Sequence, residues 1–144
     1  MEAVQEIMSR NVKTADENAS LYEVAGMMKK YDISTVIITR GNAPVGIITE
    51  RDMAQKVVAA GLDGKKTIAR QAMSYPLQGI TPDTNIYYAH SLMQKEHFKK
   101  LPVLDNGRLV GIVTQTDVNN YFTQKRKEFV MSALGREMRD KYPV

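Results

Sequence analysis

The sequence predicts a mixed α+β (α/β) fold of two βαββα units, packed sheet to sheet about a pseudo-twofold axis, with a C-terminal helical tail. The main observation is an internal repeat. Residues 45–52 (VGIITERD) recur as residues 110–117 (VGIVTQTD), and this offset of 65 positions holds without a gap from Met8 to Asp52. Such a repeat indicates duplicated supersecondary units. In each copy an apolar run ends in Thr and Asp follows three residues later, which is typical of a buried strand leading into a helix.

The composition is that of an ordinary globular protein. The 144 residues include no cysteine, which excludes a disulfide framework, a thiol catalyst and a cysteine-based metal site. No apolar run approaches the roughly 18 residues of a membrane span, and the N-terminus lacks a signal-peptide pattern, so we expect a cytoplasmic protein without membrane contacts. The net charge of +4 suits an anionic small ligand or weak contact with nucleic acid, and does not decide between them.

The first unit, residues 1–62, is expected to begin with a strand and a helix. Residues 8–14 mix apolar and polar side chains and predict a short strand. Ser20 and Glu23 have the spacing of a capping box, and the apolar stripe behind them predicts a helix that runs to about Lys30.

A hairpin and a second helix should complete the first unit. Residues 35–39 and 45–49 are rich in β-branched side chains and flank a turn at residues 41–42, which predicts two antiparallel strands. Asp52 follows the second strand, and we expect it to be the N-cap of a helix that ends at Gly61.

The rest of the chain is predicted to be a linker, a second unit and a tail. Residues 63–70 form the linker, and residues 71–124 repeat the plan of the first unit. Residues 125–144 lie outside the repeat and predict a basic amphipathic helix. Its apolar face, which needs a partner surface, consists of Phe129, Val130, Ala133, Leu134 and Met138.

The repeated segments carry a resemblance to a known family. Residues 44–52 and 109–117, with ISTV at 33–36 and FKKLPV at 98–103, resemble a pair of cystathionine-β-synthase (CBS) domains, or Bateman module, of the stand-alone archaeal and bacterial type. The resemblance covers about residues 1–122. It implies a non-catalytic regulatory module and a homodimer. It also implies an adenosine-containing ligand, either AMP, ADP, ATP or an S-adenosyl compound, in clefts between the two repeats.

The resemblance also implies site residues, because the Thr-x-x-Asp turn of one unit meets strands of the other in this family. In the first cleft these are Thr49, Arg51, Asp52, Leu77, Gln78, Lys99, Lys100 and Pro102. In the second cleft they are Val12, Lys13, Ser34, Thr35, Thr114, Thr116 and Asp117. Each Asp is a candidate for the ribose, because a carboxylate can accept hydrogen bonds from both sugar hydroxyls.

The two clefts differ in charge. The first has Arg51 and the lysines at 99–100 on its phosphate side, where the second has Thr116 and residues 34–35. The first therefore suits a charged nucleotide, whereas the second suits a nucleoside or an S-adenosyl compound, or stays empty.

Simpler interpretations stay open for the same positions. Asp52 and Asp117 could act only as helix caps. Gly46 and Gly111 lie inside predicted strands, where glycine indicates a bulge or a close approach of backbone or ligand.

The sequence gives no support for catalysis. No Ser has a motif-placed His partner, a Walker-type phosphate loop is missing, and His90 and His97 are the only histidines. We therefore expect no enzyme, no catalytic cofactor and no metal site. The first hypothesis is an adenosine-ligand sensor that acts on an unknown regulated protein. The alternative is a scaffold that binds a protein or nucleic acid through its basic tail, with vestigial clefts.

Overall fold

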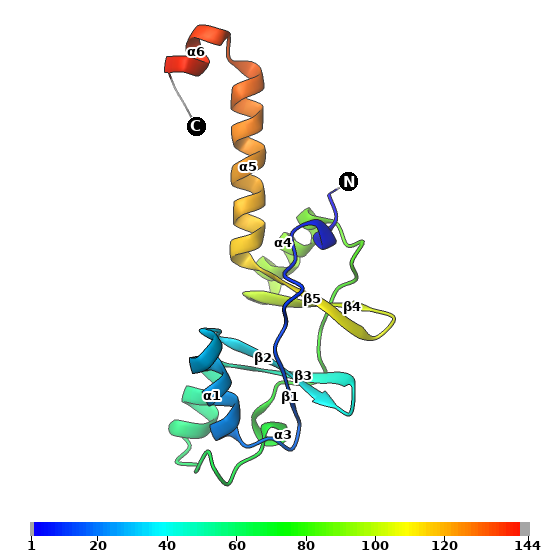
Figure 1. Ribbon diagram of the computed structural model, residues 1–144, viewed down its shortest axis with the longest axis vertical. Helices are drawn as coiled ribbons and strands as arrows, with labels where there is room; N and C mark the ends of the chain where they lie inside the picture. The colour runs from blue at the N-terminus through cyan, green and yellow to red at the C-terminus, as the bar shows by residue number, and fades with distance from the viewer. Residues whose placement is uncertain (1, 142–144) are drawn as a thin grey trace.

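The structure, a computed structural model that describes residues 2–141, contains the two units and the helical tail that the sequence predicts (Figure 1). One unit lies above the other in Figure 1, and the tail extends away from both. The last three positions of the predicted tail, residues 142–144, lie outside the described residues.

The first unit follows the predicted order of strands and helices. Its elements are η1 (Val4–Glu6), β1 (Thr14–Asp16), α1 (Leu21–Tyr31), β2 (Thr35–Arg40), β3 (Ala43–Thr49), α2 (Glu50–Asp52) and the π-helix η2 (Met53–Val58). Ser20 caps α1 and accepts from the Glu23 N–H at 3.1 Å, as its position before an apolar stripe predicts. The first strand begins later than predicted, because Ser9 pairs instead with Ile112 of the second unit.

The second unit repeats this arrangement. Its elements, with the tail, are α3 (Ala69–Ala72), α4 (Ile86–Glu96), β4 (Lys100–Asp105), β5 (Arg108–Thr114), α5 (Gln115–Ala133) and α6 (Arg136–Lys141). The tail is two helices rather than one, since α5 ends where Leu134 becomes extended before Gly135. Within residues 2–141, no helix is long and apolar enough to cross a membrane.

The two sheets confirm the repeat in three dimensions. In the first sheet, β1 is parallel to β2 and β2 is antiparallel to β3; in the second, β4 is antiparallel to β5. The register shifts at Ile38/Thr39 in one hairpin and at Val103/Leu104 in the other, which are equivalent positions. Ile80 makes a parallel bridge to Val103, where β1 lies in the first unit.

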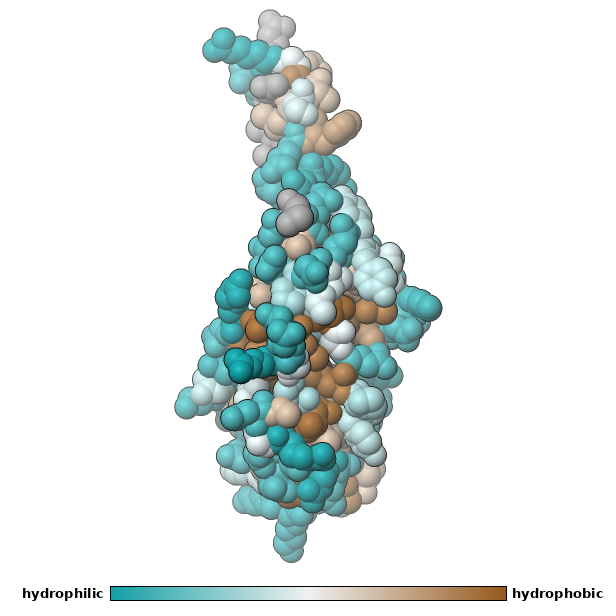
Figure 2. Space-filling view, turned by 90° about the vertical axis from the view of Figure 1, so that its right-hand side faces the viewer, coloured by the Kyte–Doolittle hydropathy of each residue, from teal (hydrophilic) through white to brown (hydrophobic). Residues whose placement is uncertain are grey.

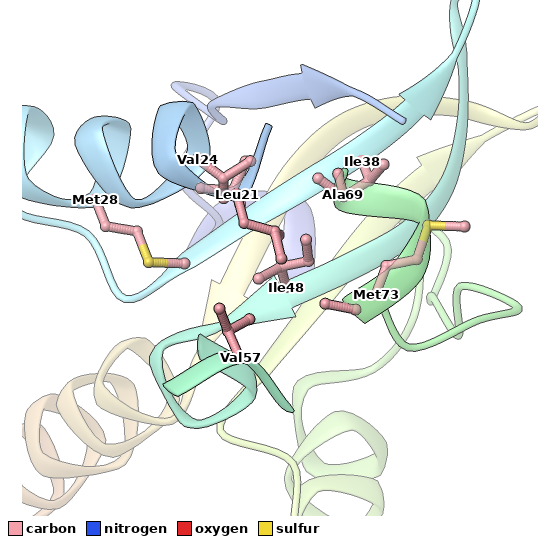
Figure 3. Close-up of a cluster of buried hydrophobic side chains, with 10 residues drawn as sticks. Leu21, Val24, Met28, Ile38, Ile48, Val57, Ala69 and Met73 are labelled. Atoms are coloured by element: carbon pink, nitrogen blue, oxygen red, sulfur yellow. The ribbon is translucent and has the colours of Figure 1, made fainter. Parts of the chain in front are cut away.

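Each unit has its own hydrophobic core. In the first, Leu21, Val24 and Met28 of α1 pack with Ile38 of β2 and Ile48 of β3 (Figure 3). The second contains equivalent residues of α4, β4 and β5, among them Ile86, Ala89, Met93, Leu101 and Val113.

Each core is completed by a segment from the start of the other repeat. Ala69 and Met73 lie in the first core, whereas Val4 and Met8 pack in the second. Backbone bonds join the same segments: the Leu21 N–H donates to Thr67 O at 2.8 Å, and the Val4 N–H donates to Thr84 O at 2.8 Å. The two units are therefore interlocked rather than simply stacked.

The two strand glycines permit this exchange. A Cβ on Gly46 would lie 2.6 Å from the Met73 sulfur and 3.0 Å from Ser74 O; on Gly111 it would lie 2.6 Å from the Met8 sulfur. Both glycines also lie at the register shifts of their hairpins. The close approach thus comes from the protein chain itself, and both predicted reasons for these glycines hold.

We predict that Gly46→Ala destabilises the protein by about 1–3 kcal/mol, because the added methyl group overpacks a backbone contact. The control is Gly26→Ala in α1, where no atom lies within 4 Å of the new Cβ and helix propensity favours alanine by about 1 kcal/mol. Urea unfolding followed by circular dichroism measures both. Equal stability of Gly46→Ala and the wild type would contradict the packing argument.

Candidate functional site

A cavity of about 570 Å³ lies between the two units and is lined by both. This volume is in the range of small-molecule sites. The first unit contributes Ser34, Thr35, Ile47, Thr49, Glu50, Arg51 and Asp52. The segment that crosses between the units contributes Ser74, Tyr75, Pro76, Leu77 and Gln78, and the second unit contributes His97, Phe98, Lys99, Lys100 and Pro102.

The acidic turn of the cavity is a helix start. Thr49 is the N-cap and accepts from the Asp52 N–H, while Asp52 Oδ2 accepts from the Thr49 N–H at 2.8 Å and from its hydroxyl at 3.1 Å. The prediction that Asp52 is the N-cap is therefore wrong by three residues. Asp52 is the return partner of a capping box, and the same arrangement joins Thr114 and Asp117 in the second unit.

The capping box leaves one oxygen of Asp52 free of the turn. Oδ1 lies 3.2 Å from the Lys56 ammonium, and the Asp52 side chain is 14% exposed. This largely buried carboxylate can still accept a hydrogen bond from a ligand in the cavity, since each carboxylate oxygen has two acceptor sites.

Positively charged residues from both units line the cavity. Lys99 and Lys100 come from the second unit, and Arg51 comes from the first. The Lys100 ammonium donates to Ser34 Oγ at 2.7 Å and so joins the units. Burial lowers the pKa of Lys100 below its ordinary 10.5, and the negative charges of Glu50 and Asp117 oppose this shift.

The floor of the cavity is the crossing segment, which is fixed to the first sheet. Ile47 and Ser74 exchange two backbone hydrogen bonds, of 3.1 and 2.9 Å. The apolar part of the lining is formed by Ile47, Pro76, Leu77, Phe98 and Pro102. A flat aromatic group could bind against this surface while polar groups of the same ligand reach Arg51, Lys99 and Lys100.

The structure brings all eight residues expected for the first cleft into one cavity. Of the seven expected for the second, Ser34 and Thr35 line this same cavity, and the others do not. Lys13 lies with its ammonium 4.4 Å from the centre of the Tyr31 ring, and Asp117 is held by its capping box.

Sequence reasoning missed several lining residues. Glu50, Ser74, Tyr75, Pro76, His97 and Phe98 all border the cavity. The signal was their position next to expected residues, since 74–76 precede Leu77 and 97–98 precede Lys99. As for metals, residues 2–141 contain no group of three or more His, Cys, Asp or Glu side chains placed to hold an ion.

Curated relatives share this sequence pattern. An uncharacterized protein of Methanopyrus kandleri is 38% identical over 118 residues, 81% of this chain and 60% of that protein, so the chain spans about three fifths of that relative's length. The CBS domain-containing protein YhcV of Bacillus subtilis is 30% identical over 118 residues, 82% of this chain and 84% of that protein.

Solved structures share the fold. A CBS-domain protein from Burkholderia ambifaria superposes with a TM-score of 0.75 at 28% identity, covering 79% of this chain and 84% of that one. The hexameric CBS-CP12 protein from bloom-forming cyanobacteria gives a TM-score of 0.75 at 26% identity, covering 98% and 80%. CBSX2, solved in complex with AMP, gives a TM-score of 0.74 at 20% identity, covering 88% and 99%, and bears on the fold alone.

The repeat, the two sheets and the cleft between the units all agree with these comparisons. The family model of the CBS domain matches twice, over residues 4–59 and 69–123. The chain therefore belongs to the CBS domain family and carries two copies of that domain.

Proposed function

We propose that the chain is a non-catalytic regulatory module that binds an adenosine-containing ligand in the cavity between its two CBS domains. The observation that carries this proposal is the convergence of Thr49, Asp52, Leu77 and Lys100, from both repeats and the crossing segment, on one cavity. A ligand there touches both units. Binding can therefore change how firmly they hold together and so act on a partner protein or on a second copy.

The lining matches the parts of a nucleotide. Asp52 offers a carboxylate oxygen to the ribose hydroxyls, and the apolar floor offers a surface for the adenine ring. Arg51, Lys99 and Lys100 supply positive charge for phosphates. This balance favours AMP, ADP or ATP over S-adenosyl compounds, whose sulfonium would meet these cations.

We predict that Asp52→Asn weakens AMP binding by about 1.5–3 kcal/mol, the scale of a hydrogen bond to a charged group. Isothermal titration calorimetry measures the affinity. The control is Asp105→Asn, an exposed position at the end of β4 outside the cavity lining, which should leave the affinity of this cavity within about twofold. Unchanged affinity in Asp52→Asn would remove this carboxylate from the ligand site.

We predict that AMP binding takes up protons at alkaline pH. Burial lowers the pKa of Lys100 in the free cavity, and a phosphate beside it favours the charged ammonium and raises that pKa again. Affinity should then fall as the pH rises from the lowered pKa towards 10.5. Calorimetry at one alkaline pH in buffers of different ionisation enthalpy measures the uptake.

The control for the proton uptake is Lys100→Met, which lacks the titrating group. Uptake of the same size in this variant would assign the protons to another residue, and no uptake in the wild type would contradict a phosphate contact at Lys100.

We also propose that the module is a homodimer. The helices that follow the hairpins expose large apolar side chains, with Val58 76% and Phe129 72% exposed. Apolar surface is visible on the tail as well as at mid-height in Figure 2. A second copy that covers these helices would bury Val58 and Phe129.

We predict that the wild type has twice the 16.2 kDa mass of one chain in light scattering, and that Phe129→Lys shifts it towards the monomer with AMP affinity intact. The control variant Lys127→Ala changes an exposed residue on the same helix and should leave the mass at that of the dimer. If Phe129→Lys stays dimeric, the tail is free for a different partner. That result would favour the alternative function, a scaffold whose tail lies outside the CBS repeats.

A further inference from the structure

Lys56 joins the acidic turn of the cavity to the segment that crosses between the units. Its ammonium lies 3.2 Å from Asp52 Oδ1, and it donates to Ala72 O at 3.1 Å and to Ser74 Oγ at 3.4 Å. Three acceptors match the three protons of an ammonium group. The Lys56 side chain therefore links the acidic turn directly to residues 72–74, in addition to the backbone hydrogen bonds between Ile47 and Ser74.

Lys56 does not line the cavity, although Asp52 and Ser74, which it holds, both do. Thr49 occupies Asp52 Oδ2 with its N–H and its hydroxyl, so Lys56 fixes the remaining oxygen. The carboxylate is thus held in one orientation before a ligand arrives. Its effect on binding would be preorganisation, which lowers the cost of ordering the site.

The second repeat provides an internal comparison. The equivalent of Lys56 is Tyr121, whose hydroxyl donates to Glu2 at 2.7 Å. The equivalent backbone also differs, since Lys56 lies in the π-helix η2 whereas Tyr121 lies in the α-helix α5. π-turns inside helices are frequent at functional sites. Within the described part of the chain, the contacts of Lys56 with Asp52, Ala72 and Ser74 are therefore found only in the first repeat, whose acidic turn borders the cavity.

We propose that Lys56 is a positioning residue of the nucleotide cavity. It fixes the Asp52 carboxylate relative to Ala72 and Ser74, where the crossing segment begins. The inference rests on the proposed function of the cavity. It adds that the affinity of the cavity depends on a side chain that does not touch the ligand.

Calorimetry with AMP tests the proposal. Lys56→Met should weaken binding about tenfold, and Lys56→Arg, which keeps charge and donors, should restore affinity to within about threefold of the wild type. The control for the loss of one positive charge is Lys29→Met on the exposed side of α1, which should bind as the wild type does. Equal affinities of Lys56→Met and the wild type would overturn the proposal.

Two further measurements separate positioning from direct contact. A lysine that touches phosphate would lose more affinity for ATP than for adenosine, whereas a positioning lysine loses the same factor for adenosine, AMP and ATP. In the Asp52→Asn background, Lys56→Met should cause little further loss, because the two residues act as one unit. A loss that grows with the number of phosphates, or full additivity, would contradict the proposal.

Urea unfolding of each variant accompanies the binding data. If Lys56→Met is partly unfolded at the assay temperature, Lys56→Gln replaces it, since glutamine removes the positive charge and keeps polar N–H donors. A wild type that binds none of adenosine, AMP and ATP would refute the proposed function itself, whereas binding that is indifferent to Lys56 would refute only this inference.

Discussion

The whole arrangement depends on a close contact between a methionine–serine segment and a glycine in a strand. Met73 and Ser74 pack against Gly46, and the equivalent Met8 and Ser9 pack against Gly111. In both places two backbone hydrogen bonds join the crossing segment to the strand. Because each crossing segment belongs to the repeat opposite the strand it contacts, neither core is complete without the other repeat. A single CBS domain of this chain would therefore lose apolar burial as well as an interface.

This exchange also gives the cavity its floor. The segment that packs Ala72 and Met73 into the first core continues directly into Tyr75, Pro76 and Leu77, which line the cavity. The shape of the site is thus tied to core packing on one side and to the capping box of Thr49 and Asp52 on the other. Capping does not remove Asp52 from the cavity, because the capping box uses Oδ2, Lys56 pairs with Oδ1, and the residue still belongs to the cavity lining.

Local patterns in the sequence predicted most of the fold, and the failures came from long-range contacts. The helix after Ser20 and both hairpins form as expected, since capping and β-branched runs are local signals. The first strand begins later than the sequence predicts, because Ser9 pairs with Ile112 of the second unit. Thr49 and Asp52 are both residue types that cap helices, so the sequence alone does not distinguish them, and only the geometry identifies Thr49 as the N-cap.

The same distinction explains the site. A perfect repeat predicts two equal clefts, and the equivalence of Ser34 to Lys99 and of Thr35 to Lys100 follows from the offset alone. In the structure the starts of β2 and β4 lie so close that Lys100 donates to Ser34, and residues from both repeats line one cavity. Duplication constrains the backbone through the glycine contacts, but it leaves the side chains around each cleft free to diverge. Lysine at position 56 and tyrosine at position 121 are one result of that freedom, so a difference in ligand affinity between the two clefts requires no change in the fold.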